Sequence, residues 1–311
     1  MVAFLFPGQG SQFPGMAADL AAGVPEAREL IDRADAALGF ALSDLMFADG
    51  DDAAEALRAT EVTQPALYVH SLAAHAALAA RGVACEVAAG HSLGEWSALA
   101  AMGAVGFEDG LRAVRRRGEL MAGAGSVRPG TMAAVLGLDA EALDAVCERA
   151  SAAGEGVVVP ANYNDPGQIV ISGDGPAVER ASAAASEAGA RRVVPLPVSG
   201  AFHSPLMAFA ADGLQATLET LDLSAPRVPV VLNVTAEPTT DPETIRTRLL
   251  EQLTSPVRWA QSLERMAAMG ADRFVEVGAG KVLSGLAKRT LGRQTETATA
   301  GTADEVAALA A

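Results

Sequence analysis

Aromatic residues, lysines and cysteines are all scarce in this chain, and each shortage excludes some classes of protein. Aromatic residues make up 4% of the 311 residues, against 50% for hydrophobic residues as a whole. Lys281 and Lys288 are the only lysines, and the formal net charge is −15. A sequence-independent nucleic-acid binder needs a broad basic face, so we expect no nucleic acid among the partners.

The two cysteines and the longest apolar runs indicate where in the cell the protein is located. Cys85 and Cys147 are isolated and have neither metal-binding nor disulfide-framework spacing. No apolar run approaches the roughly 18 residues of a membrane span. The amino-terminal run lacks the basic region and cleavage signature of a signal peptide. We therefore expect a soluble, cytoplasmic protein with no metal site, no resident cofactor and no membrane partner.

The order of apolar runs and turns predicts an α/β protein with two domains. Val2–Phe6 and Val83–Ala89 are apolar runs ending at Pro-Gly or Gly, which is typical of buried strands. The segment between SVRPG and PVSG predicts the order β-α-β-β-α-β, the ferredoxin-like pattern. We predict an inserted domain at 128–198 within a larger domain formed by 1–127 and 199–311. The residues from 293 onward are expected to be frayed or weakly helical.

Two glycine-rich turns suggest nucleotide binding, but neither has the required pattern. Gly8-Gln9-Gly10 lacks the third glycine of a dinucleotide fingerprint, because Phe13 stands at that position. Gly278-Ala279-Gly280-Lys281 lacks the leading glycine of a phosphate loop and has Val282 where Ser or Thr is needed. We expect no nucleotide cofactor.

The segment GHSLGEW, residues 90–96, places Ser92 between two glycines. The predicted strand before it and helix after it give the strand-turn-helix context of a nucleophile elbow. The backbone N–H of Leu93 begins the helix and can stabilise an oxyanion. This pattern alone fits ester hydrolysis, acyl transfer or a tight turn without a catalytic role.

A nucleophilic serine needs a base, and the chain has four histidines. His70 and His75 lie in a predicted helix and are more typical of surface or core-edge residues. His91 is adjacent to Ser92, and we expect it to support the turn or line the pocket. His203 lies in a loop after the last predicted strand of the insert and is the best candidate by elimination.

Six segments together resemble the malonyl-CoA:acyl carrier protein transacylase family, which includes the acyltransferase domains of polyketide synthases. They are FPGQGSQ (6–12), GHSLGEW (90–96), RRGELM (116–121), NYNDPGQIVISG (162–173), GAFHSPLM (200–207) and EVGAGKVLSGLAKR (276–289). The resemblance covers nearly the whole chain. It implies an α/β-hydrolase-like large domain with a ferredoxin-like insert, and a discrete acyltransferase of fatty-acid or polyketide synthesis.

The resemblance also implies a role for each residue at a matching position. Ser92 would carry the acyl group, with His203 as general base and later acid. The Leu93 N–H and Gln9 would form the oxyanion hole. Gln252 would orient the histidine through its carbonyl, which suffices to fix the tautomer and ring direction.

Substrate choice is implied by a second group of residues. Arg117 would bind a substrate carboxylate through two parallel hydrogen bonds, so malonyl fits and acetyl leaves the charge unpaired. The ring of Phe202 resembles malonyl-type members, where it leaves little room for an α-branch. Gly200 departs from the histidine frequent in synthase-embedded malonyl domains, so unusual extender units stay open. We expect the pocket to be lined also by His91, Met121 and Asn162.

The implied reaction is a ping-pong transfer of malonyl from malonyl-CoA, through Ser92, to the phosphopantetheine thiol of an acidic, transiently bound acyl carrier protein. We expect a monomer whose carrier-docking area includes some of Arg115, Arg116, Lys281, Lys288 and Arg289.

Two alternative functions stay open. An esterase would not need Arg117 to pair a carboxylate, and a non-catalytic binding module would not need Ser92, His203 and Gln9.

Overall fold

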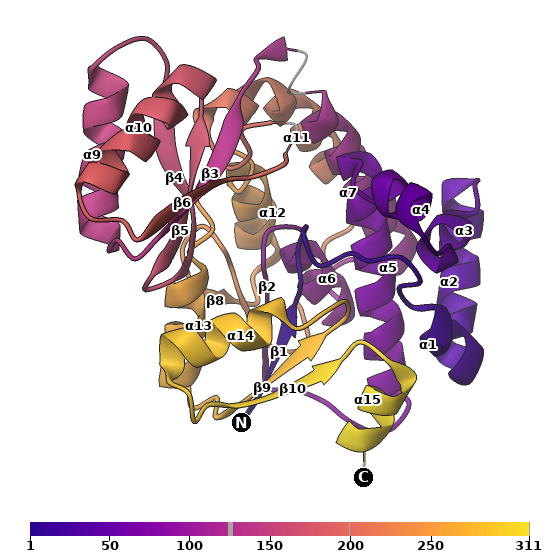
Figure 1. Cartoon of the computed structure of the whole chain (residues 1–311). Coiled ribbons are helices and arrows are strands. Elements are labelled where there is room, and N and C mark those ends of the chain that lie inside the picture. Colours follow the sequence, from indigo (N-terminus) through magenta and orange to yellow (C-terminus); the bar gives the residue numbers. More distant parts are fainter. Residues whose placement is uncertain (124–126, 199, 311) are drawn as a thin grey trace.

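The protein is described by a computed structural model that covers residues 1–123, 127–198 and 200–310 (Figure 1). Within these residues the chain forms two β-sheets, each with helices packed against it. None of the helices in the described part of the chain is both long and apolar enough to cross a bilayer. Ser126 and Ser199, at the predicted domain boundaries, lie outside the described residues.

The larger sheet has six strands in the order β10-β9-β1-β2-β7-β8. Neighbouring strands pair in parallel, except that β7 and β8 are antiparallel. Because the carboxyl ends of parallel strands share one edge, the loops after β1, β2, β7 and β9 meet there. The strands are β1 (Val2–Phe6), β2 (Val87–Gly90), β7 (Val230–Val231), β8 (Pro238–Thr239), β9 (Arg273–Val277) and β10 (Glu296–Ala300).

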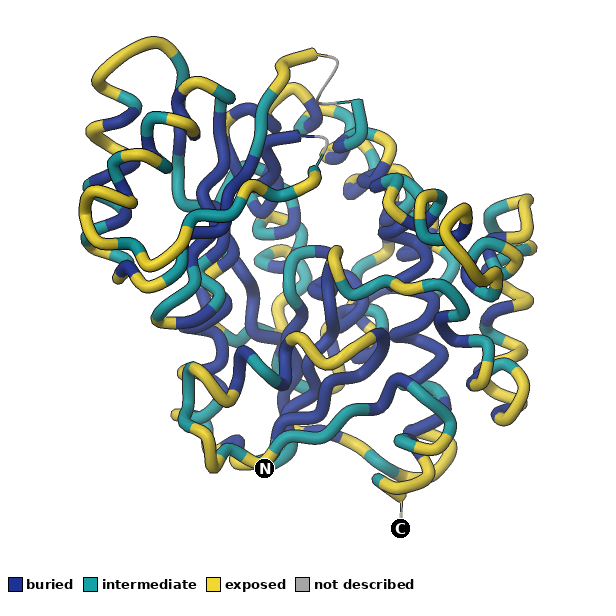
Figure 2. The backbone as a smooth tube through the Cα atoms, in the orientation of Figure 1, coloured by how far each residue is buried: buried dark blue, intermediate teal, exposed yellow. Residues whose placement is uncertain are grey.

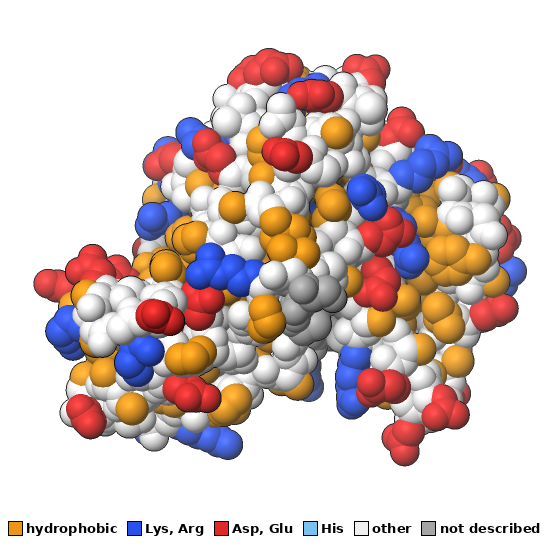
Figure 3. Space-filling view, turned by 90° about the horizontal axis from the view of Figure 1, so that it is seen from above, with side chains coloured by type: hydrophobic (Ala, Val, Ile, Leu, Met, Phe, Trp, Pro, Cys, Tyr) orange, Lys and Arg blue, Asp and Glu red, His pale blue; other side chains and the backbone are white. Residues whose placement is uncertain are grey.

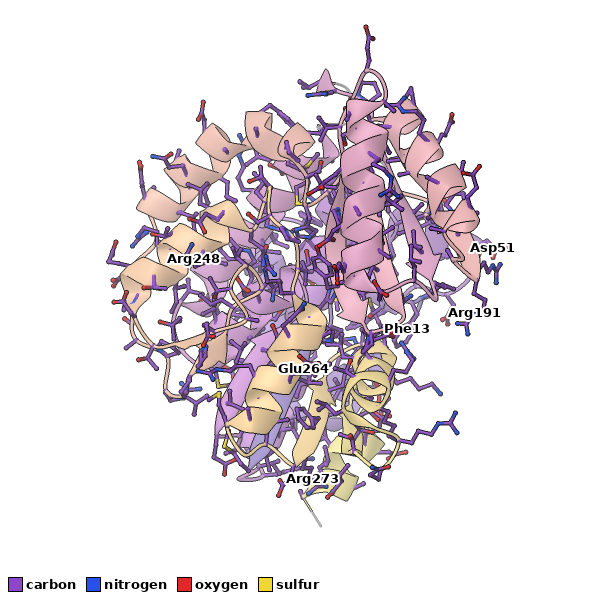
Figure 4. The ribbon with its side chains drawn as sticks, turned by 90° about the vertical axis from the view of Figure 1, so that its left-hand side faces the viewer. Phe13, Asp51, Arg191, Arg248, Glu264 and Arg273 are labelled. Atoms are coloured by element: carbon purple, nitrogen blue, oxygen red, sulfur yellow. The ribbon has the colours of Figure 1, made fainter. Side chains whose placement is uncertain are left out.

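Helices cover both faces of the larger sheet, so alternate strand residues pack into different cores. Phe4 and Phe6 pack with α5, α6 and α7, whereas Ala3 and Leu5 pack with α13 and α14. Helix α13 turns Glu264 outward (Figure 4). The helices around this sheet are α1 (Ala18–Gly23), α2 (Pro25–Leu38), α3 (Leu42–Phe47), α4 (Asp51–Ala56), α5 (Thr60–Ala79), α6 (Leu93–Ala101), α7 (Phe107–Ala122), α11 (Ala211–Glu219), α12 (Pro242–Glu251), α13 (Trp259–Ala268), α14 (Val282–Leu291) and α15 (Ala303–Leu309).

The smaller sheet lies within the segment predicted as the insert. Its strands run antiparallel in the order β4-β5-β3-β6, which is the ferredoxin-like arrangement. One face packs against two helices in a core of its own. The elements are β3 (Thr131–Leu136), α9 (Ala140–Ala152), β4 (Val158–Asp165), β5 (Gln168–Gly173), α10 (Gly175–Glu187) and β6 (Arg192–Pro195).

The two sheets are joined through the other face of the smaller sheet and through strand β4. Met132, Ala161 and Val170 pack into the main core together with Phe202, which lies outside the predicted insert. The backbone of Val257 exchanges hydrogen bonds with β4, accepting from the N–H of Tyr163 and donating to the carbonyl of Ala161. These contacts hold the smaller sheet over the carboxyl edge of the larger sheet, where the elbow loop lies.

Three segments differ from the sequence prediction. The strand predicted over Val83–Ala89 is β2, which begins only at Val87 and ends at Gly90. The end of the chain, expected to be frayed or weakly helical, forms edge strand β10 and helix α15 instead, because β10 pairs in parallel with β9. The predicted helix from Pro205 begins as a 3-10 helix over Pro205–Ala210 before α11. Figure 2 shows that the central strands of the larger sheet are mostly buried, whereas its edge strands β8 and β10 are partly exposed.

Candidate active site

Ser92 sits on a sharp turn between β2 and α6. Its backbone has φ 52° and ψ −107°, a positive-φ conformation outside the standard allowed regions that is costly for a residue with a side chain. The flanking glycines allow the close packing that holds this turn. A Cβ at Gly90 would lie 1.8 Å from the carbonyl oxygen of Gly94, and a Cβ at Gly94 would lie 2.0 Å from that of Phe6. The elbow therefore requires glycine at both positions.

His203 is the histidine that the fold brings to Ser92. Its Nε2 lies 2.8 Å from the Ser92 Oγ, and its Nδ1 lies 2.9 Å from the backbone oxygen of Gln252. Since a carbonyl only accepts, Nδ1 carries the proton and Nε2 is free to receive one from the serine. Burial, reinforced by the charge of Arg117, lowers the pKa of His203 to about 3, so the ring is neutral at pH 7.

Arg117 is buried beside the nucleophile and is held by amide oxygens. It donates to Gln64 Oε1 at 2.7 Å and to Gln252 Oε1 at 3.0 Å, and its Nη2 also lies 3.3 Å from the Ser92 Oγ. Burial lowers its pKa to about 10, an effect opposed by the charge of Glu95, so the guanidinium remains protonated at pH 7. Neutral partners orient it while leaving a positive charge at the serine.

The two groups expected to form an oxyanion hole both border the pocket. Leu93 is the first residue of α6, and the first N–H groups of a helix lack intrahelical partners. Gln9 is exposed in the loop after β1, and its side chain donates to the Thr60 hydroxyl at 3.3 Å. Leu93 and Gln9 thus border the pocket from the segments that follow the adjacent strands β2 and β1.

A pocket of about 120 Å³ surrounds these groups. Its walls come from both parts of the molecule: Met132, Leu196 and Val198 belong to the smaller sheet and its exit. Of the ten residues that we expected at the site, nine line the pocket, and Gln252 lies behind them in contact with three of those nine. The lining residues are Gln9, His91, Ser92, Leu93, Arg117, Met121, Met132, Asn162, Leu196, Val198, Phe202 and His203.

His91 and the two other histidines have separate environments. The ring of His91 lines the pocket, contacts the Asn164 side-chain oxygen at 2.8 Å through Nε2 and packs edge-on against Trp259. The Nε2 of His70 lies 2.8 Å from the Gly301 carbonyl oxygen, in the core. His75 lines a second pocket near the amino ends of β2 and β7. His70 is completely buried, not at the surface or core edge as expected.

Sequence reasoning missed three buried polar residues around the nucleophile. Gln64 orients Arg117, Asn233 accepts a hydrogen bond from the Ser92 N–H at 2.8 Å, and Glu95 accepts one from the Asn233 N–H at 2.5 Å. All three have no exposed surface. The sequence does show that Gln64 is a polar residue within an apolar helical segment. It also shows that Asn233 is a polar residue at the end of an apolar strand.

A serine on a strained elbow, hydrogen-bonded to a neutral histidine in an α/β-hydrolase-like fold, defines a serine enzyme that forms acyl esters. Residues 3–307 match the acyl transferase domain family. The chain belongs to that family.

Proteins of known name and structure resemble the whole chain. A malonyl CoA-acyl carrier protein transacylase of Bacillus subtilis is 49% identical over 93% of this chain and 90% of its own length. The crystal structure of an acyl carrier protein S-malonyltransferase from Vibrio cholerae has a TM-score of 0.93 and 42% identity over 99% of both chains. A type II PKS malonyl-transacylase in complex with its acyl carrier protein has a TM-score of 0.92 and 39% identity, covering 99% of this chain and 98% of that one.

Proposed function

We propose that this protein transfers a malonyl group from malonyl-CoA, through an ester on Ser92, to the phosphopantetheine thiol of an acyl carrier protein. The observation that carries the substrate class is a buried, charged Arg117 within 3.3 Å of the Ser92 Oγ. A carboxylate two bonds from the reacting carbonyl gives that cation an anionic partner. An acyl group without a carboxylate leaves a buried charge unpaired.

The first half-reaction loads the enzyme. The Ser92 hydroxyl gives its proton to His203 Nε2 while Oγ attacks the thioester carbonyl carbon. The resulting oxyanion accepts hydrogen bonds from the Leu93 N–H and from Gln9. Collapse of this intermediate breaks the C–S bond, and His203 returns the proton to the departing CoA sulfur.

The second half-reaction reverses these roles. The carrier thiol gives its proton to His203, and its sulfur attacks the malonyl ester on Ser92. Collapse then breaks the ester C–O bond, and Oγ takes the proton back from His203. Each proton and bond is balanced by serine, histidine and two thiols, so we propose that the reaction uses no resident cofactor or metal.

We propose that the carrier docks beside the loop that follows β9. Lys281 ends that loop, and its neighbour Gly280 packs beside the loop that holds Gln9. Of the other basic residues expected to dock the carrier, Arg115 and Arg116 pair with Glu119. Acidic and basic side chains are interspersed over the face seen in Figure 3, and no broad basic face is visible there. An acidic carrier would therefore have to be attracted by a small basic area. We propose that the enzyme acts as a monomer.

The function is tested by incubating the protein with radiolabelled malonyl-, methylmalonyl- or acetyl-CoA, with and without holo carrier protein. We expect stable malonyl labelling of the wild type, transfer of the label to the carrier and no labelling of Ser92→Ala. Weaker methylmalonyl and acetyl labelling is expected from the ring of Phe202 and the charge of Arg117. Release of free malonate without transfer would identify a hydrolase and contradict the proposal.

A further inference from the structure

Asn233 lies directly beneath the catalytic elbow although it is far from it in sequence. It follows β7 at the carboxyl edge of the larger sheet and has no exposed surface. Both of its backbone groups are held in place. Its N–H donates to Glu95 Oε2 at 2.5 Å, and its carbonyl accepts from the Arg258 N–H at 2.9 Å. The position of its side chain is therefore set by the surrounding fold.

The Asn233 amide binds the elbow on both sides of the turn. Its oxygen accepts from the Ser92 N–H at 2.8 Å, and its nitrogen donates to the Gly90 carbonyl at 2.7 Å. Reversing the amide would place donor against donor and acceptor against acceptor, so a single orientation satisfies both bonds. Without this side chain, a backbone donor and a backbone acceptor next to the strained Ser92 would lose their partners.

The same amide oxygen also orients Gln252. It accepts a second hydrogen bond, from Gln252 Nε2 at 3.2 Å, and that nitrogen also donates to the Ser92 carbonyl at 3.1 Å. In this orientation the other side-chain atom of Gln252, Oε1, accepts from Arg117, while its backbone oxygen accepts from His203. One asparagine thus connects the nucleophile with the residue that touches both the base and the arginine.

We propose that Asn233 is a positioning residue for acyl transfer: its amide holds the Ser92 turn and the Gln252 side chain so that nucleophile, base and arginine act together. The inference rests on the proposed function of the same site. Asn233 does not touch the acyl group, and it acts through Ser92 and Gln252. A misplacement of reacting groups by about 1 Å can cost a factor of about 100 in rate.

The first test measures single-turnover labelling of Ser92 at saturating malonyl-CoA for Asn233→Ala. We expect labelling to be slower by about 100-fold in protein that remains folded at the assay temperature, as judged by its thermal unfolding curve. The matched control is Ser97→Ala on helix α6. Its hydroxyl is buried without a partner among the described residues, so its rate should stay within about twofold of wild type.

The second test separates positioning from general destabilisation. Asn233→Asp keeps the size of the side chain and an acceptor for Ser92, but it places a carboxylate oxygen against the Gly90 carbonyl. Protonation of that carboxyl supplies an O–H donor in place of the lost N–H. Burial raises the pKa of a carboxyl, so this protonation occurs within the assay range. The ratio of variant to wild-type labelling rate should rise by about tenfold between pH 8 and pH 5.5.

The charged groups around Asn233 do not produce that trend. Glu95 lies at its backbone, and Arg117 and His203 lie beyond Gln252. Burial raises the pKa of Glu95 to about 8, so Glu95 titrates in the same range, and a carboxyl at position 233 raises that pKa further. Asn233→Ala keeps all three groups without adding a carboxyl, so its pH profile is the reference, and the rise toward low pH should occur in Asn233→Asp alone. General destabilisation would make the variant worse at low pH, because acid protonates buried histidines in the unfolded state.

The outcomes distinguish this inference from the proposed function. Labelling of Asn233→Ala within about threefold of wild type would overturn the positioning role, as would an Asn233→Asp ratio that falls or stays flat toward low pH. Failure of the wild type itself to form a malonyl ester would instead overturn the proposed function.

Discussion

The two ends of the larger sheet each hold a pocket with a histidine near a serine or cysteine, but only one is organised for catalysis. At the carboxyl end, His203 bonds to Ser92 and to a backbone carbonyl. At the amino end, His75 shares a pocket of about 270 Å³ with Cys85, and the Cys85 sulfur faces that of Met102 at 3.8 Å. Burial lowers the pKa of both histidines, to about 3 for His203 and to about 4 for His75.

The comparison shows that a buried base and a nearby nucleophile are not sufficient. His75 packs against the rings of Phe4 and Phe6, with no hydrogen bond to fix its tautomer in the described part of the chain. Burial raises the pKa of the Cys85 thiol to about 12, so it remains protonated. The amino end has a histidine and a nucleophile type of residue but no hydrogen bond between them in the described part of the chain. At the carboxyl end, histidine and nucleophile are hydrogen-bonded to each other.

Replacing the two histidines in turn should give the largest difference between the pockets. We expect His203→Gln to lower the rate of malonyl transfer by about 10⁴-fold, because the serine loses its general base. His75→Gln should leave that rate within about twofold of wild type. The measurement is steady-state transfer to the carrier thiol. Similar losses in both variants would show that the amino-end pocket takes part in catalysis.

Removing the arginine of each pocket should test substrate choice. Arg117→Ala is expected to lower malonyl loading by at least about 100-fold, while acetyl loading holds or rises because a buried unpaired charge is removed. Arg227→Ala, at the amino-end pocket, should change neither. Initial rates with each acyl-CoA give the selectivity ratio. Equal losses of malonyl and acetyl loading in Arg117→Ala would disprove the carboxylate-binding role.

Both histidines should lower the stability of the folded protein at acid pH, so in this respect the two pockets should behave similarly. Both histidines have folded-state pKa values below the usual 6.5, so the stability that each contributes is complete above pH 6.5 and is lost as pH falls toward the folded value. For the buried His203, the loss of unfolding free energy at pH 5 is about 2 kcal/mol. For His75 the loss is only about 1 kcal/mol, because its partial exposure lets solvent screen the effect.

Urea unfolding at pH 7 and pH 5 measures this effect. The loss of unfolding free energy between the two pH values should shrink by these amounts in His75→Gln and in His203→Gln. Unchanged pH dependence in both variants would mean that neither histidine is held neutral by burial. The comparison would then rest on hydrogen bonding alone.

How far the sequence predicts this structure depends on the range of the interactions. The elbow follows from local glycine spacing, and the four-stranded antiparallel sheet follows from the order of its elements. Arg115, Arg116 and Arg117 are identical residues in a row, and only their rotation about α7 buries Arg117 while leaving the others at the surface. Edge strand β10 depends on β9, more than twenty residues earlier, and local composition cannot show that partner.

The polar residues around the site were the least predictable part. Gln64 and Asn233 act only through side chains that the fold brings from other elements, 53 and 141 residues away in the chain. No local pattern specifies those partners. The family resemblance named the groups expected to contact substrate, and the fold adds buried polar residues that are hydrogen-bonded to them.

The last prediction concerns the reactivity of Cys85, where no change in catalysis is expected. With a pKa of about 12 against the usual 9, its thiolate fraction at pH 8 should be lower by about 10³-fold, and modification slower in proportion. Cys147 is also buried with a pKa of about 12, so Cys147→Ala isolates the signal from Cys85. A disulfide reagent should modify Cys85 in native Cys147→Ala far more slowly than free cysteine, and at the ordinary rate after denaturation. Fast modification of the native variant would mean that a thiolate is stabilised at the amino end. In that case an activated nucleophile would be present at both ends of the sheet, and the contrast between the two pockets would not hold.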